Sequence, residues 1–111
     1  MKIDESLSFL RENKKALLQK IIANLKEEVE GLRYIILFGS YARGEEKATS
    51  DLDILLLTEQ EIPREIRGGL SSECEEKNID LVFYTMEQFD ASDCLLISEI
   101  RKEGIVVWKQ K

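Results

Sequence analysis

Two aspartates stand two residues apart in the stretch ILFGSYARGEEKATSDLDILLL, which runs from Ile36 to Leu57. Residues i and i+2 of a strand point to the same face, so Asp51 and Asp53 are expected to project side by side, about 6–7 Å apart. Carboxylates this close repel each other unless a cation lies between them. Their hard oxygen ligands suit Mg²⁺ or Mn²⁺. The alternative is that Asp51 caps the strand and Asp53 faces water.

A Gly-Ser turn precedes the two aspartates. Gly39 ends an apolar run, and a glycine there lets another group approach the backbone closely. The following residues, Tyr41 to Arg43, are expected to begin a helix whose N–H groups point back at the turn, which is an anion site suited to phosphate. The Ser40 hydroxyl can donate to a phosphate oxygen. The alternative is an ordinary strand-to-helix turn with Ser40 as the N-cap.

A third acid, Asp80, begins another apolar run, in NIDLVFY. If that run is a strand beside the Asp51–Leu57 strand, Asp80 lies about 5 Å away across the sheet. Three converging carboxylates could hold two metal ions, and the second ion could activate an attacking hydroxyl. The alternative is an aspartate that simply marks the start of a strand.

Apolar periodicity predicts the elements that position these residues. A helix is expected within residues 12–33, with Leu18, Ile21 and Leu25 on its buried face and Gly31 as its stop. A separate helical turn is expected near residues 7–10. Short β-branched or aromatic runs predict four strands, at residues 33–39, 51–57, 79–84 and 105–108. One helical turn, residues 40–43, closed by Gly44, follows the first strand.

The second half of the chain carries two more helical patterns. Residues 62–78 have apolar side chains four apart, but Gly68 and Gly69 each weaken a helix by about 1 kcal/mol, so we expect a frayed helix or a helix and loop. Thr85 and Gln88 match a capping box that opens a helix ending before Gly104, with a break near Asp90. The prediction is one α/β (α+β) domain, residues 1–111, with a mixed sheet of about four strands and helices packed on it.

Charge and composition exclude several classes of function. The 111 residues carry 22 acidic and 16 basic side chains, a net charge of -6, which argues against tight binding to nucleic acid. The acidic balance suits a basic partner protein or a phosphate ligand that arrives with metal ions. The chain has no histidine and two cysteines, so zinc sites and Ser-His or Cys-His catalysis are nearly excluded.

Cys74 and Cys94 are predicted to be free, partly buried thiols in a reducing cytosol. No apolar run approaches the ~20 residues that span a bilayer, so we expect no membrane contact and a cytoplasmic protein. The apolar residues near the C-terminus, Val106, Val107 and Trp108, are predicted to be core; the alternative is a homo-oligomer contact.

The motif FGSYARGEEKATSDLDILLL resembles the signature G-S-x(10)-D-x-D of the DNA polymerase β-like nucleotidyltransferases. In so short a chain, GSYARG followed by SDLDILL looks like the minimal nucleotidyltransferases (MNT proteins) of prokaryotes. The resemblance covers residues 33–84. The residues that match the signature are Gly39, Ser40, Asp51, Asp53 and Asp80, and of these Asp80 depends most on the alignment, because its distance from the first pair varies.

The resemblance implies an enzyme that binds a nucleoside triphosphate, expected to be ATP, with two Mg²⁺ ions or Mn²⁺. Gly39 and Ser40 would hold the terminal phosphates. The three aspartates, Asp51, Asp53 and Asp80, would ligate the metals, with Asp80 also acting as base towards the acceptor hydroxyl. Arg43 would help to neutralise the leaving pyrophosphate; the alternative for it is a solvated surface arginine.

Many MNT proteins are paired with a HEPN-domain ribonuclease, as the antitoxin of a toxin–antitoxin system. Family behaviour implies transfer of AMP to a hydroxyl of that partner protein. Relatives that modify small hydroxylated drugs carry a further domain for the acceptor, so the acceptor surface here is expected to belong to another protein. The competing hypothesis is a non-catalytic antitoxin that neutralises a HEPN partner by contact alone. A plain structural domain would require the three motifs to coincide by accident.

Overall fold

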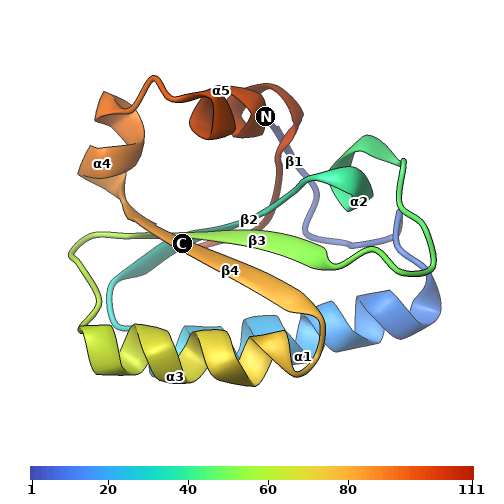
Figure 1. Ribbon diagram of the computed structural model, residues 1–111, viewed down its shortest axis with the longest axis horizontal. Helices are drawn as coiled ribbons and strands as arrows, with labels where there is room; N and C mark the ends of the chain where they lie inside the picture. The colour runs from blue at the N-terminus through green and yellow to red at the C-terminus, as the bar shows by residue number, and fades with distance from the viewer.

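The computed structural model describes all residues, 1–111, as a sheet between two layers of helices (Figure 1). The elements in chain order are β1 (Lys2–Ile3), α1 (Glu12–Glu28), β2 (Leu32–Phe38), α2 (Ser40–Arg43), β3 (Leu52–Thr58), α3 (Arg64–Glu75), β4 (Ile79–Thr85), α4 (Met86–Ala91), α5 (Leu95–Glu103) and β5 (Ile105–Lys109). Helices α1 and α3 cover one face, α4 and α5 the other, and α2 lies at one end of the sheet. No helix combines the length and apolar character that crossing a membrane requires.

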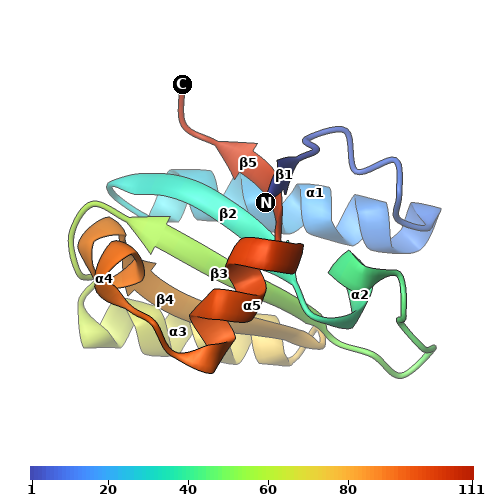
Figure 2. The ribbon, with the colours of Figure 1, turned by 90° about the horizontal axis from the view of Figure 1, so that it is seen from above.

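The five strands follow the order β1-β5-β2-β3-β4 and form a mixed sheet (Figure 2). β2 is antiparallel to both of its neighbours, β3 and β5. β3 and β4 are parallel, as are β1 and β5. The parallel pair β3–β4 is joined through α3, which is the usual helical crossover for parallel strands. The mixed α/β sheet predicted from the sequence is therefore confirmed.

The central strands are buried on both faces, which explains their continuous apolar runs. Alternate residues of β3 enter two separate clusters. Leu52, Ile54 and Leu56 pack on the α1 and α3 side, and Leu55 and Leu57 pack on the α4 and α5 side. Asp53 shares the face of Leu55, because residues two apart in a strand point the same way. The carboxylate therefore belongs to the α5 side of the sheet.

Several predicted elements differ in detail from the structure. The first helix ends at Glu28, and Gly31, with φ of 74°, forms the turn into β2 instead of stopping the helix. The segment near residues 7–10 is a hydrogen-bonded turn and not a helix, with the Leu10 N–H donating to the Leu7 carbonyl. β1 was not predicted, and it adds a fifth strand to the sheet of about four strands expected from the sequence.

The helices of the second half are more regular than expected. α3 is one continuous helix through Gly68 and Gly69, both of which are exposed. The capping box is confirmed: the Gln88 N–H donates to the Thr85 hydroxyl and the Thr85 N–H donates to the Gln88 side chain, each at 3.0 Å. The expected break falls between Ala91 and Leu95 and separates α4 from α5.

The C-terminal strand completes the core. Val106 and Val107 are buried, and Trp108 is half-buried against the cluster on the α1 side, so the prediction of core positions is confirmed. Both cysteines are free thiols, as predicted. Cys74 is buried on the inner face of α3, but Cys94 is exposed at the start of α5, so the expectation of partial burial was wrong for that thiol.

Candidate active site

The candidate site is built around the turn between β2 and α2. Gly39 has φ of 77° and ψ of -153°, a conformation that is essentially restricted to glycine. It is the N-cap of α2, and its carbonyl accepts the N–H groups of Ala42 and Arg43, each at 3.1 Å. The N–H groups of Ser40 and Tyr41, at the first two positions of α2, have no acceptor within the helix. The predicted one-turn helix, closed by Gly44 in the left-handed conformation, is confirmed.

Gly39 also permits the close approach of Asp53 from the neighbouring strand. A Cβ atom on Gly39 would overlap the Asp53 carboxylate and would lie 3.2 Å from its Cγ atom. The last residue of β2, Phe38, is the register partner of Asp53, which explains this approach. The glycine of the phosphate-type turn and the second aspartate of the D-x-D pair are therefore in direct contact.

Asp53 and Asp80 are register partners on the parallel strands β3 and β4. Register partners on adjacent strands point to the same face, with backbones about 4.8 Å apart. Both carboxylates accordingly lie on the α5 side of the sheet, at the edge where β3 and β4 begin. This position is next to the end of β2, because β2 runs antiparallel to β3.

Burial and like charges both act on Asp53. Its side chain is half-buried, and desolvation raises the pKa of this carboxyl above its ordinary value, with the charges of Asp80 and Asp51 adding to the rise. The positive charge of Arg43 acts in the opposite direction and is the weakest of these influences on the pKa. A site of this kind gains stability by taking up a cation, because a cation favours the charged carboxylate.

Asp51 lies just outside β3, which begins at Leu52, and its side chain is exposed. The charge of Asp51 contributes to the raised pKa of Asp53, but no three Asp, Glu or Cys side chains lie close enough together to enclose a metal ion. The donor set nevertheless has the chemistry for Mg²⁺ or Mn²⁺: carboxylate oxygens, one of them half-buried and electrostatically unsatisfied. The predicted convergence of all three carboxylates on two ions stays a prediction.

Arg43 is held beside the turn by two glutamates. Its Nε donates to Glu45 at 2.7 Å, and its Nη1 donates to Glu103 of α5 at 3.3 Å. These contacts raise the pKa of the guanidinium, with the hydrogen bond to Glu45 contributing most. Arg43 is thus a partly exposed, ion-paired arginine and not a freely solvated one. No motif in the sequence pointed to Glu103, which lies 60 residues further along the chain.

A shallow cleft opens between α5 and the turn. It measures about 120 Å³, and its lining includes Phe38, Gly39, Arg43, Leu96 and Glu103. Helix α5 therefore borders the turn on one side, while Asp53 of β3 lies against Gly39. The sequence did not indicate that α5 would line this site, because α5 carries no motif.

Residues 5–111 match the family described as Polymerase beta, Nucleotidyltransferase. The chain belongs to this nucleotidyltransferase family. The turn at Gly39 and Ser40, followed by Asp51 and Asp53, accordingly lies within the family domain. The family resemblance drawn from the sequence is confirmed.

A curated relative is 50% identical over 42 residues, which is 38% of this chain and 48% of the relative. It is a Methanocaldococcus jannaschii protein with the provisional name protein adenylyltransferase MJ1215. The matched segment therefore spans about half the length of that relative.

Solved structures of nucleotidyltransferases and toxin–antitoxin complexes share the fold. A chain of a toxin–antitoxin crystal structure with AMP-PNP has a TM-score of 0.67 at 26% identity, covering 84% of this chain and 73% of its own. A nucleotidyltransferase from Sulfolobus solfataricus, also provisionally named, has a TM-score of 0.62 at 24% identity. The match covers 86% of this chain and 79% of that one. A chain from the complex of a tri-AMPylated Shewanella oneidensis HEPN toxin with MNT antitoxin has a TM-score of 0.62 at 21% identity. The match covers 87% of this chain and 73% of that one. The last two likenesses support the fold alone.

Proposed function

We propose that this nucleotidyltransferase moves AMP from ATP to a hydroxyl group of a partner protein. The observation that carries the proposal is the pairing of Asp53 and Asp80 in register, directly beside the Gly39 turn. A phosphate-binding turn and paired carboxylates on one face of a sheet are the parts that phosphoryl transfer needs, because positioning and charge neutralisation provide most of its catalysis.

In this proposal the turn binds the triphosphate. The Ser40 hydroxyl and the N–H groups at the start of α2 donate to oxygens of the terminal phosphates. Arg43, at the other end of the same short helix, adds positive charge beside the leaving pyrophosphate. Its ion pairs with Glu45 and Glu103 fix the direction of the guanidinium.

The three carboxylates have two roles in this proposal: they bind the divalent ions, and one of them accepts a proton. Asp51, Asp53 and Asp80 would hold the divalent ions, Mg²⁺ or Mn²⁺, which neutralise phosphate charge and lower the pKa of the acceptor hydroxyl when bound. Asp80 is the exposed member of the register pair and takes the proton of the acceptor hydroxyl. The acceptor oxygen forms a bond to the α-phosphorus, the bond from that phosphorus to the β-bridging oxygen breaks, and pyrophosphate leaves.

We infer that the acceptor is a HEPN-type toxin and that this chain is its antitoxin. Solved relatives with this fold come from toxin–antitoxin complexes, one of which holds an AMPylated HEPN toxin. The curated relative is provisionally named a protein adenylyltransferase, which favours a protein acceptor. The net charge of -6 suits a basic, RNA-binding partner.

The test is label transfer to a HEPN protein encoded beside this chain. With Mg²⁺ and ATP labelled at the α-phosphate, we expect label on the partner; ATP labelled at the γ-phosphate should leave the partner unlabelled. Asp53→Asn should abolish transfer. Asp90→Asn, on α4 at the other end of the sheet, is the matched control and should retain it. Label from the γ-phosphate would overturn the proposal.

The same variants separate catalysis from neutralisation by contact. If Asp53→Asn still protects cells from the toxin as well as the wild-type chain does, contact alone explains neutralisation. If protection is lost while the variant still co-purifies with the toxin, the transfer reaction explains it.

A further inference from the structure

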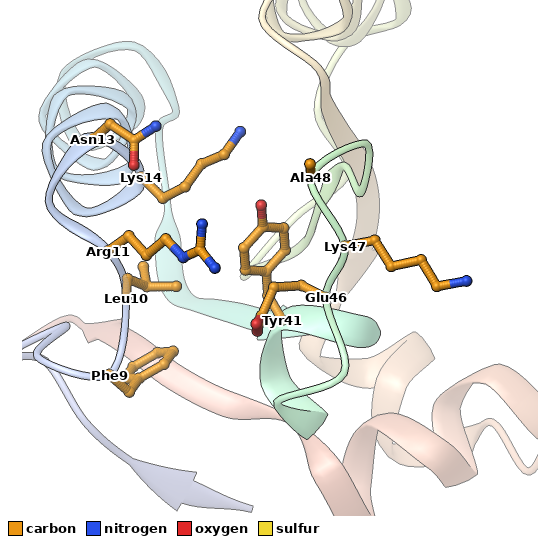
Figure 3. Close-up of a pocket in the computed structure, with 9 residues that line it drawn as sticks. All are labelled: Phe9, Leu10, Arg11, Asn13, Lys14, Tyr41, Glu46, Lys47 and Ala48. Carbon is orange, nitrogen blue, oxygen red and sulfur yellow. The ribbon is translucent and has the colours of Figure 1, made fainter.

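A second pocket lies on the opposite face of the sheet from the paired aspartates. It has a volume of about 210 Å³ and lies between the start of α1 and the loop that follows α2 (Figure 3). Tyr41 of α2 forms its inner wall and packs with the cluster on the α1 side, whereas Phe38 packs with the cluster on the α5 side. The pocket is therefore separate from the site described above, and a ligand bound there would take no part in the proposed transfer reaction.

Tyr41 presents an unpartnered hydroxyl to this pocket. The residue is buried, with only 7% of its surface exposed, yet its hydroxyl makes no hydrogen bond within the protein. Every buried side-chain oxygen or nitrogen that solvent cannot reach has a partner, so the pocket must give access to the Tyr41 oxygen. In Figure 3 the oxygen points between Lys14 and Ala48. A tyrosine buried to this degree usually finds a partner for its hydroxyl.

The N-terminus of α1 opens at the same pocket. This helix has 17 residues, and its N-cap Arg11 makes no side-chain capping bond. Within α1, Lys15 is the first residue whose N–H donates to a backbone carbonyl, that of Arg11, so the N–H groups of residues 12–14 have no backbone acceptor. Uncapped N–H groups at the positive end of a long helix dipole favour an anion.

Two cations reinforce that preference. Arg11 and Lys14 both extend towards Tyr41 in Figure 3, and the Lys14 ammonium lies 5.9 Å from the centre of the Tyr41 ring. Neither cation forms an ion pair with a carboxylate, although the chain carries an excess of acids. Glu46 is the one acid among the lining residues, and its side chain extends towards Tyr41 in Figure 3, whereas the Lys47 ammonium points away from the pocket.

The remaining wall is aromatic and apolar. Phe9 is 37% exposed at one side of the pocket, and Ala48 lies across from it. Aromatic rings and an arginine plane stack well with a flat ring of a ligand. Phosphate oxygens match the donors, because a phosphate monoester carries close to two negative charges and several acceptor oxygens.

We propose that this pocket binds a small phosphate monoester carried on an aromatic ring. The phosphate lies at the first turn of α1, where Arg11, Lys14 and the Tyr41 hydroxyl donate to it. The ring lies against Phe9. This ligand differs from the triphosphate of the proposed reaction, and it requires neither the aspartates nor a metal ion.

The test is an NMR titration of the ¹⁵N-labelled chain with phenyl phosphate in the presence of EDTA. We expect shifts at the amides of Glu12 and Asn13, and an affinity at least about fivefold higher than for inorganic phosphate. Arg11→Gln should weaken binding about tenfold, and Tyr41→Phe about threefold, because the first removes a charged donor and the second a neutral one. Arg64→Gln, at the first position of α3, is the matched control and should change nothing.

Three results would overturn the proposal. The first is no shift at the start of α1 up to about 10 mM phenyl phosphate. The second is equal affinity for phenyl phosphate and inorganic phosphate, which would leave a plain anion site without a role for the ring. The third is binding that Ser40→Ala abolishes and Arg11→Gln leaves intact, which would assign the ligand to the turn at Gly39. The proposed transfer reaction can fail its own test without affecting these outcomes.

Discussion

Gly39 and Asp53 are in contact across the β2–β3 pair, and the contact exists only because residue 39 has no side chain. Two requirements coincide at this glycine. Its backbone angles are essentially restricted to glycine, and its missing Cβ leaves the space that the Asp53 carboxylate occupies. The turn that would bind phosphate and the carboxylate that would bind metal therefore constrain each other directly.

Gly39→Ala should separate backbone strain from this contact when it is compared with Gly44→Ala. Both glycines flank α2 and have positive φ, but a Cβ on Gly44 would meet nothing within 4 Å. We expect Gly44→Ala to cost about 1 kcal/mol of unfolding free energy, and Gly39→Ala at least about 2 kcal/mol. Urea denaturation measures both. Transferase activity should fall at least about tenfold in Gly39→Ala only, because the added methyl group displaces Asp53. Equal effects of the two changes would contradict the importance of the contact.

Asp53→Asn should stabilise the metal-free protein at neutral pH. Burial and the two neighbouring aspartates raise the pKa of Asp53, so the folded state binds a proton more readily than the unfolded chain does. Ionised Asp53 therefore destabilises the fold above its raised pKa. The gain from Asn should shrink as the pH falls through that pKa, and it should vanish below the unfolded value of about 3.9. Melting temperatures between neutral and acidic pH measure this dependence.

Asp4→Asn is a control for which we expect the opposite change in stability at neutral pH. Hydrogen bonds from the Ser6 hydroxyl and N–H lower the pKa of Asp4, so its carboxylate form stabilises the fold. The Asn variant should be less stable than the wild type above the unfolded pKa, and the difference should disappear as the pH falls through the lowered folded value.

A second test of the charge on Asp53 uses the metal ion. Mg²⁺ should raise the melting temperature of the wild type and not that of Asp53→Asn. A melting temperature of Asp53→Asn below that of the wild type at neutral pH would contradict this electrostatic account.

Arg43→Gln should weaken nucleotide binding more than it destabilises the fold. The side chain is 37% exposed, and its two ion pairs are partly solvated, so the variant should unfold at nearly the same urea concentration as the wild type. Affinity for ATP should fall about three- to tenfold, because a charge beside the phosphates is removed. Arg33→Gln is the matched control: this arginine also pairs with a glutamate, Glu59, at 3.0 Å, and lies away from the turn. Similar ATP affinity in the two variants would assign Arg43 a structural role alone.

The sequence allowed the central strands and the turn to be predicted because their signals are local. The strands β2 and β3 are apolar on both faces, and a run such as ILLL is typical of a strand inside a layered sheet. The sequence predicted that Asp80 would lie across the sheet from the Asp51–Leu57 strand if the two strands were neighbours. They are neighbours, because α3 connects β3 to β4 as a parallel crossover, and the register partner of Asp80 is Asp53. The capping box at Thr85 was likewise readable, because all of its atoms lie within four residues.

The features that escaped prediction depend on distant contacts. β1 has two exposed residues and exists through its pairing with β5, about one hundred residues away. Helix α3 tolerates Gly68 and Gly69 because both lie on the solvent side, while Leu70 and Cys74 pack against the sheet. Tertiary packing outweighs helix propensity at such positions. The ion pair between Arg43 and Glu103 and the place of α5 beside the turn have no sequence signal at all.

The two cysteines should react at very different rates with a thiol reagent. Hydrogen bonding to Ser92 is the largest influence that lowers the pKa of Cys94, and this thiol is exposed. Burial between α3 and the sheet raises the pKa of Cys74, which lies on the inner face of α3. Because the thiolate is the reacting form, one thiol of the native protein should react rapidly with Ellman's reagent, and the second should react only after unfolding in urea. Cys94→Ser should remove the rapid phase, whereas Cys74→Ser should leave it unchanged. A rapid phase that survives in Cys94→Ser would contradict the burial of Cys74 and, with it, the packing of α3 on the sheet that brings β4 and Asp80 alongside β3.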